Sequence, residues 1–218
     1  AVALSGAEPV EYRLTGNNGW MPDLDEIGRM GVGNVKIMII NYPHMPTGAV
    51  PTPGIFADLI GFARRNNILL VHDNPYSFIR NPHPSSLLAA PGAKDVAVEL
   101  NSLSKSHNMA GWRIGMIAGA KERIDEILRF KSNMDSGMLL ALQDAAVEAL
   151  SLADDWYAGL NDEYYAREIL GYKILDMLEC TYTEGQAGLF IWSRLPDSFA
   201  GDSYAFSDSI LEKNGVFI

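Results

Sequence analysis

Short apolar runs alternate with a helix-spaced segment in the first half of the chain. Val35–Ile40 and Ile68–Val71 are rich in β-branched and aliphatic residues, and each predicts a buried strand. Between them, Ile55–Asn67 carries apolar residues at the spacing of one helix face. Asp95–Leu100 predicts a third strand and Trp112–Ala118 a fourth. Strands separated by a helix favour βαβ units, so the pattern predicts an α/β fold with a mostly parallel sheet.

The second half of the chain is dominated by helical spacing. Lys121–Phe130 and Met138–Leu152 predict two helices, and Asp154–Glu179 predicts one long amphipathic helix. Beyond it, Leu189–Leu195 predicts a strand and Ser203–Lys213 a helix. These shorter elements after a long helix indicate a second structural unit.

This change of pattern predicts the domain organisation. We expect residues 1–153 to form part of a large α/β domain, residues 154–179 a linking helix, and residues 180–218 the beginning of a smaller α+β domain. The apolar segment Gly215–Ile218 predicts a strand that continues beyond the sequence. We therefore expect the chain to be a piece of a longer protein.

Composition and charge narrow the class of protein. Hydrophobic residues make up 48% and charged residues 20%, which is typical of a globular protein. The net charge of −10 argues against nucleic acid as a main partner, because phosphate backbones are bound by clustered Lys and Arg. No apolar run reaches the length of a membrane span, so no membrane partner is expected. The single cysteine, Cys180, cannot form an internal disulfide, and we expect a cytoplasmic protein.

The histidines do not predict a metal site. Metal-binding histidines in sequence motifs recur at short fixed intervals, and the four in this chain do not. We interpret them as polar or packing residues and expect no metal; they are His44, His72, His83 and His107.

The first segment with candidate chemistry follows the third predicted strand, at Ser102-Leu-Ser-Lys105. A lysine that loses solvation after a buried strand becomes nucleophilic towards an aldehyde. The hydroxyls of Ser102 and Ser104 and the guanidinium of Arg113, a little further on, suit a phosphate group. Taken alone, the segment is equally consistent with a polar turn that carries a surface lysine.

A second segment, Asp73-Asn-Pro-Tyr76, follows the second predicted strand. A carboxylate directly after a buried strand is costly unless it has a partner, and a protonated ring nitrogen of a ligand would suit it. The Tyr76 hydroxyl could donate to an oxygen of the same ring. In isolation, an Asp at this place more commonly caps the following turn. Because ligands of α/β sheets bind beyond the carboxyl ends of the strands, we expect these segments to converge.

Four motifs in this order resemble the class I/II aminotransferases among the fold-type-I pyridoxal phosphate enzymes. The resemblance covers nearly the whole chain, and its local style is most similar to bacterial aspartate and LL-diaminopimelate aminotransferases. It implies an incomplete three-layer α/β/α large domain plus the start of a small domain. The motifs are the Pro-Thr-Gly loop at Gly48, Asp73-x-x-Tyr76, Ser102-x-Ser-Lys105 and Gly111-x-Arg113-x-Gly115.

The resemblance also implies roles for individual residues. Lys105 matches the lysine that forms a Schiff base with pyridoxal 5'-phosphate and moves the substrate proton. Asp73 matches the partner of the pyridine nitrogen, and Tyr76 the tyrosine that hydrogen-bonds the ring hydroxyl. The implied phosphate ligands are Ser102, Arg113 and, as a further contact, Ser104.

The chain departs from the family pattern in two ways. Met45 stands where the family usually has an Asn that donates to the ring hydroxyl, and the loss of one such hydrogen bond costs about 1–3 kcal/mol. Family members also have a long N-terminal part, and they continue past Ile218 to an arginine that binds the substrate carboxylate. We therefore expect a chain truncated at both ends, with a partial cofactor site.

The function implied by the resemblance is an aminotransferase that moves an amino group between an amino acid and a 2-oxo acid, as a homodimer when full length. Two alternatives remain open. One is a carbon–sulfur lyase or decarboxylase on the same scaffold. The other is a non-catalytic, aminotransferase-like regulatory domain, although such regulators carry a basic DNA-binding element and this chain is acidic.

Overall fold

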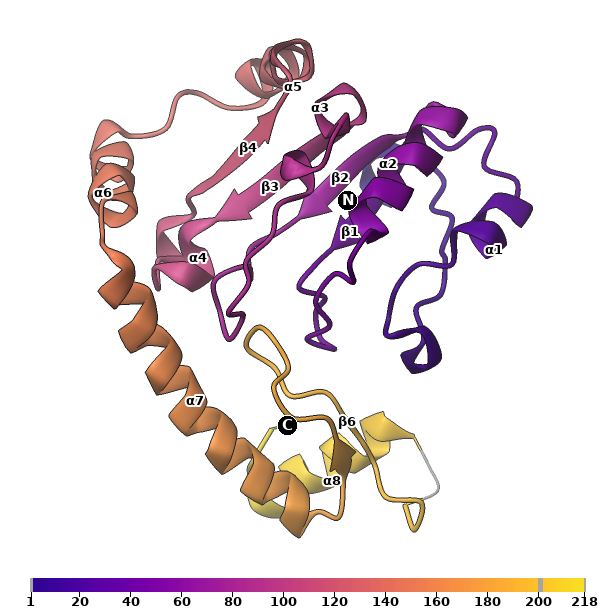
Figure 1. Ribbon diagram of the computed structural model, residues 1–218. Helices are drawn as coiled ribbons and strands as arrows, with labels where there is room; N and C mark the ends of the chain where they lie inside the picture. Colours follow the sequence, from indigo (N-terminus) through magenta and orange to yellow (C-terminus); the bar gives the residue numbers. More distant parts are fainter. Residues whose placement is uncertain (1, 200–201, 218) are drawn as a thin grey trace.

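A four-stranded sheet forms the centre of the computed structural model, which describes residues 2–199 and 202–217 (Figure 1). The strands lie in the order β1-β2-β3-β4. β1 and β2 are parallel to β3, whereas β4 is antiparallel to it. This architecture confirms the predicted α/β fold with a mostly parallel sheet. The strands are β1 (Ile37–Asn41), β2 (Leu69–Asp73), β3 (Ala97–Ser102) and β4 (Gly115–Gly119).

Helices connect and follow the strands. α2 begins at Ile55 and ends where Asn67 adopts a left-handed φ of 53°, which closes the last helical turn. Within the described ranges no helix is both long enough and apolar enough to cross a membrane. The helices are α1 (Leu24–Arg29), α2 (Ile55–Asn66), α3 (Ala93–Val96), α4 (Leu103–Ser106), α5 (Lys121–Met134), α6 (Leu140–Leu150), α7 (Asp154–Met177) and α8 (Ser203–Asn214).

The main core lies between the sheet and α2. Leu59 and Ala63 of α2 and Leu70 of β2 are fully buried in one cluster. Along β1 the side chains alternate, as expected for a strand, and Met38 and Ile40 are buried in that cluster. The core therefore fixes the positions of β1 and β2, and with them the segments that follow their carboxyl ends.

Two predicted strands begin later than expected. Asp95 and Val96 of the predicted third strand lie in α3 instead, because Gly92 turns the chain at φ 76° and the Asp95 amide donates to the Gly92 carbonyl at 3.3 Å. The fourth strand begins at Gly115 and not at Trp112, because Arg113 adopts a left-handed φ of 55° that is incompatible with a strand.

The last part of the chain departs further from prediction. Only Ser193–Arg194 of the predicted strand Leu189–Leu195 pairs, as β6, with β5 (Thr181–Tyr182). Upstream of β6, the Gln186 side chain binds the backbone amide and carbonyl of Trp192 at 2.6 and 2.8 Å, which competes with strand pairing.

The predicted strand at Gly215–Ile218 is wrong for the residues that the structure describes. Gly215 ends α8 with a left-handed φ of 68°, and its amide donates to the Leu211 carbonyl at 2.8 Å. Val216 and Phe217 form no strand and are exposed, while Ile218 lies outside the described residues.

α7 runs from the side of the sheet to the C-terminal unit, which consists of β5, β6 and α8 (residues 178–199 and 202–217) (Figure 1). Much of the predicted apolar face is turned inward, since Tyr172 is buried and Trp156, Leu160 and Leu175 are partly buried, and the buried Glu168 adds polar contacts. Glu168 accepts hydrogen bonds from Arg80 Nε and Nη2 at 3.0 and 2.7 Å. The Tyr172 hydroxyl donates to Glu168 at 2.6 Å and accepts from the Gly185 amide at 3.0 Å. These contacts join the segment after β2, the helix and the C-terminal unit.

Candidate functional site

The carboxyl ends of the parallel strands place the predicted segments at one rim of the sheet. Asn41 at the end of β1 is in register with Asp73 at the end of β2. The Asn41 side-chain nitrogen donates to the Asp73 backbone carbonyl at 2.7 Å. Its side-chain oxygen accepts from the Met45 backbone amide, also at 2.7 Å. The sequence did not indicate this role for Asn41, which fixes the Pro-Thr-Gly loop beside the second strand.

Lys105 lies on α4, which follows β3 without an intervening loop. Ser102 caps this helix, because its hydroxyl accepts from the Ser104 amide at 3.1 Å. The half-buried Lys105 points its ammonium towards the Tyr76 ring, with Nζ 6.0 Å from the ring centroid. Among the described residues Nζ makes no hydrogen bond or ion pair. The structure thus brings Lys105 and Tyr76 together and leaves the amine available to a ligand.

Asp73 and Tyr76 have complementary chemistry at this rim. The Asp73 carboxylate accepts no hydrogen bond within the described part of the chain. Partial burial raises the pKa of Asp73, and the neighbouring charge of His72 acts to lower it. Burial, and then the charge of Asp73, raise the pKa of the Tyr76 phenol, which therefore keeps its proton. The pair offers one acceptor and one donor to a bound ring.

The three predicted phosphate ligands are only partly assembled. The Ser102 hydroxyl lies 2.9 Å from the Ser104 hydroxyl, so these two side chains are adjacent. Arg113 is exposed, and its guanidinium donates to the Ala110 carbonyl at 3.0 Å. Within residues 2–199 and 202–217 it makes no hydrogen bond to either serine. It nevertheless belongs to the segment that runs beside them, since the Ser102 hydroxyl also donates to the Ile114 carbonyl at 3.3 Å.

The C-terminal unit reaches the same rim through residues 186–188. Gly48 has a φ of 67°, and a Cβ there would lie 2.6 Å from the Gln186 Cβ, so only glycine permits this approach. The Ala187 amide donates to the Gly48 carbonyl at 3.0 Å. A Cβ on Gly188 would overlap the Met45 Cε. Met45 therefore packs against the C-terminal unit instead of offering a polar group to the site.

A buried polar network beneath the rim was missed at the sequence level. His72 is in register with Glu99 on the neighbouring strand, and the two side chains are 3.0 Å apart. The available signal was a titratable residue inside each of two apolar runs, Val-His-Asp and Val-Glu-Leu. The sequence alone indicates only a polar or packing role for His72, because periodicity does not reveal which strands are neighbours.

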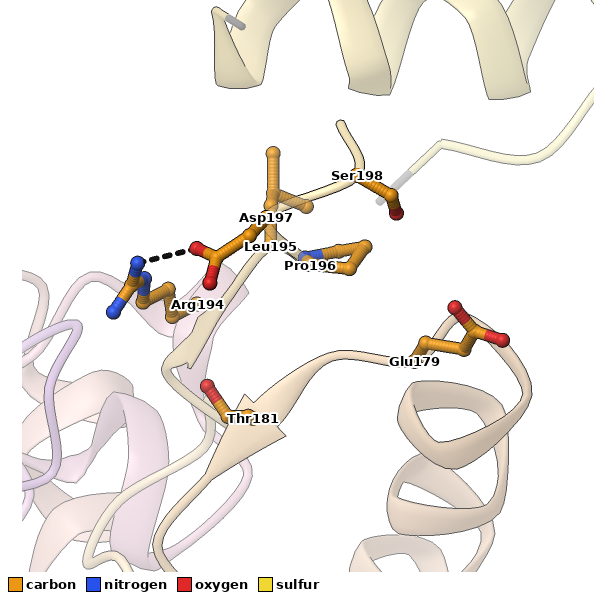
Figure 2. Close-up of a pocket in the computed structure, with 7 residues that line it drawn as sticks. All are labelled: Glu179, Thr181, Arg194, Leu195, Pro196, Asp197 and Ser198. Carbon is orange, nitrogen blue, oxygen red and sulfur yellow. Dashed lines mark hydrogen bonds and ion pairs between the residues drawn. The ribbon is translucent and has the colours of Figure 1, made fainter. Parts of the chain in front are cut away.

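A surface cavity of about 340 Å³ lies elsewhere, in the C-terminal unit (Figure 2). Its lining shares no residue with the Lys105 site, and its one cation, Arg194, is already paired with Asp197. Within the described ranges no group of three or more His, Cys, Asp or Glu could hold a metal. The lining residues are Glu179, Thr181, Arg194, Leu195, Pro196, Asp197 and Ser198.

Comparison with known proteins gives concordant results. An LL-diaminopimelate aminotransferase from Dehalococcoides mccartyi is 39% identical over 99% of this chain and 55% of its own length. The enzyme of the same name from Desulforudis audaxviator shows the same identity and coverage. The structure of BacF from Bacillus subtilis matches with a TM-score of 0.93 and 33% identity, over 99% of this chain and 55% of that one.

A further structural match is a probable N-succinyldiaminopimelate aminotransferase from Thermus thermophilus, with a TM-score of 0.88 and 30% identity over 97% of this chain and 56% of that chain. The chain thus spans about half the length of the curated relatives it matches. The family described as aminotransferase class I and II matches residues 1–218. The resemblance expected from the motifs is confirmed, and the chain belongs to the aminotransferase class I and II family.

Proposed function

We propose that this chain is part of a pyridoxal phosphate-dependent aminotransferase, which moves an amino group between an amino acid and a 2-oxo acid. The observation that carries the proposal is the arrangement of Lys105, Tyr76 and Asp73 at one rim. Nζ lies 6.0 Å from the tyrosine ring, and neither the amine nor the Asp73 carboxylate has a hydrogen-bond partner among the described residues. Residues 1–153 would belong to the cofactor-binding domain, 154–179 to the linking helix and 180–218 to the small domain.

The chemistry of these side chains fits pyridoxal phosphate. When bound, this cofactor supplies an aldehyde that captures amines and a ring that accepts electrons. Lys105 would hold the aldehyde carbon, Asp73 the protonated ring nitrogen and Tyr76 the ring oxygen. Ser102 and Ser104 would bind the phosphate, joined by Arg113 once its guanidinium leaves the Ala110 carbonyl.

Each of these side chains then has a defined task in catalysis. The Lys105 amine would remove and return the proton on the substrate Cα as a general base and acid. The Asp73 carboxylate would keep a proton on the ring nitrogen through charge pairing. The Tyr76 phenol, which its surroundings keep protonated, would donate to the ring oxygen. Met45 offers no hydrogen-bond donor in its side chain, so Tyr76 alone among these residues would serve that oxygen.

The names of the relatives suggest which substrates to test first. LL-diaminopimelate aminotransferases are at 35–39% identity to this chain, so LL-diaminopimelate is the first amino donor to test. We also propose a cytoplasmic homodimer for the full-length protein; family membership supports the dimer, and a single cysteine fits the compartment.

Absorption spectroscopy tests the proposal. Addition of pyridoxal phosphate to the full-length protein should give a visible band that Lys105→Ala abolishes. Lys121→Ala is the matched control, since that side chain is 80% exposed on α5 and should leave the band intact. A band that survives in Lys105→Ala would show that the assignment of Lys105 is wrong. Pyruvate and ammonia formed without an amino acceptor would instead favour the carbon–sulfur lyase.

A further inference from the structure

A fully buried histidine lies directly beneath the candidate site. His72 is 0% exposed and immediately precedes Asp73 on β2. Its Nε2 lies 2.9 Å from the Tyr42 carbonyl oxygen, and its Nδ1 lies 3.0 Å from Glu99 Oε2. The Phe56 ring of α2 covers it at a centroid distance of 5.3 Å. Both ring nitrogens therefore face oxygen atoms in a site without solvent.

The hydrogen bonds around Glu99 identify it as an ionised carboxylate. Besides His72, it accepts from Asn74 Nδ2 at 3.2 Å, from the Ser86 hydroxyl at 2.9 Å and from the Leu87 amide at 2.8 Å. An acceptor-only carboxylate suits this set of donors, because Oε2, the oxygen that faces His72 Nδ1, already accepts from both Ser86 and Leu87 and has no lone pair left to carry a proton. Burial acts to raise the pKa of Glu99, but the hydrogen bond and charge of His72, with the bonds from Ser86 and Asn74, hold it below the ordinary value.

This environment decides the protonation of His72. The Tyr42 carbonyl can only accept, so Nε2 must carry a hydrogen. Because Glu99 is an anion, Nδ1 must carry one as well. We propose that His72 is a buried imidazolium, paired with Glu99, whose positive charge acts on the carboxylate of the neighbouring Asp73.

The backbone on both sides of the Asp73 side chain is held by hydrogen bonds. The Asp73 carbonyl accepts from the Asn41 side chain at 2.7 Å, and the next amide, of Asn74, donates to the Leu100 carbonyl at 2.9 Å. The Asp73 carboxylate itself receives no hydrogen bond from the described residues. The charged and titratable groups around His72 and Asp73 are Glu99 on β3, Tyr76 in the turn after β2, and Lys105 on α4, whose ammonium faces the Tyr76 ring. Of the groups that act on the pKa of Asp73, His72 is the one that lowers it.

The role given to Asp73 rests on the proposed function, but the charge of His72 can be measured on the protein without cofactor. Proton–nitrogen NMR of the full chain near neutral pH should show two slowly exchanging N–H signals from the His72 ring. The exposed His83 serves as the control and should show none. A single protonated nitrogen on His72 would overturn the proposal. Failure of pyridoxal phosphate to bind would contradict the proposed function and leave these signals unchanged.

A second measurement tests the effect on Asp73. The titration midpoint of the Asp73 carboxyl carbon, followed by NMR without cofactor, should move upward by about one pH unit in His72→Gln. Glutamine keeps a donor for the Tyr42 carbonyl but carries no charge. Ser77→Ala is the control, because it removes only the hydroxyl that donates to Asn74 at 2.6 Å, and it should leave the midpoint in place.

An unchanged midpoint in folded His72→Gln would contradict the coupling. If His72→Gln does not fold, Glu99→Gln tests the charged pair itself. That variant keeps the shape of the side chain and removes the anion, so one of the two His72 ring N–H signals should disappear. Retention of both signals in Glu99→Gln would overturn the proposed pair.

Discussion

Two neighbouring regions of this molecule differ sharply in how deeply their apolar side chains are buried. In the region of β1–β3 and α2, side chains such as Leu59 and Leu70 are fully buried. In the region of β4, α5 and α6, no residue of either helix is buried, and Phe130 and Leu140 are 69% and 67% exposed. Both regions contain helices with apolar residues, but only that of the first region, α2, buries them against a partner surface within the described structure.

The contrast shows which region of the molecule fixes the positions of the residues in the candidate site. Asp73 and Ser102 end strands of the packed region, and Lys105 follows directly on α4. Next to Lys105, Leu103 is 1% exposed and joins a small cluster with Met109 that reaches partly buried residues of α6. The positions of the chemical groups therefore depend on the first region, while the second contributes one limited contact.

The largest expected effect is the loss of the buried carboxylate. Glu99→Ala would leave the His72 ring without its acceptor in the core, and it should lower the free energy of unfolding by about 3–5 kcal/mol. The matched change in the second region is Asp125→Ala, which breaks an exposed pair with Lys121 on α5 and should cost about 0.3–0.5 kcal/mol. Urea unfolding of both variants measures the two losses in the free energy of unfolding. Equal losses would contradict the difference in burial between the two regions.

Truncation of apolar side chains should give the next largest difference. Leu70→Ala removes a fully buried side chain from the sheet core and should cost about 2–5 kcal/mol, because it leaves a cavity. Leu140→Ala in α6 should change stability by about 0.5 kcal/mol or less, because that side chain is already exposed. A large loss in Leu140→Ala would mean that α6 is packed in solution.

Acid should weaken the folded state through groups that include His107, at the end of α4, and Glu99 on β3. Burial lowers the pKa of His107 below 6.5, so the folded state binds this proton less well than the unfolded state, and stability should fall as the pH drops below 6.5. The pKa of Glu99 is lowered from 4.5, so its contribution is present above that value and is lost as the pH falls through the lower folded value. The free energy of unfolding, measured against pH, should fall less below pH 6.5 in His107→Gln than in the unchanged protein. An unchanged profile would contradict this assignment.

The sequence predicted local features better than contacts between distant segments. The helices at Ile55 and Lys121 begin where their spacing indicated, since helical periodicity is a local property. The antiparallel direction of β4 and the pairing of His72 with Glu99 depend on which strands become neighbours, and no local pattern carries that information. The chemical segments were found because they follow strands, which places them at one rim.

The details of the site show the same limit. Met45 was identified as a departure from the family, but its packing against Gly188 required the fold of the C-terminal unit. Arg113 was expected beside the serines, and its bond to the Ala110 carbonyl follows from a left-handed backbone that the sequence does not reveal. The roles of Lys105, Asp73, Tyr76 and their neighbours in cofactor binding stay predictions.

The most direct test of the account is chemical trapping of the cofactor on the full-length protein. Pyridoxal phosphate is added, the covalent link to lysine is reduced with borohydride, and the labelled peptide is identified by mass spectrometry. We predict a single major label on Lys105, with little on exposed lysines such as Lys121. Label spread over the surface lysines, with none preferred, would contradict the central claim that Lys105 lies in a cofactor site.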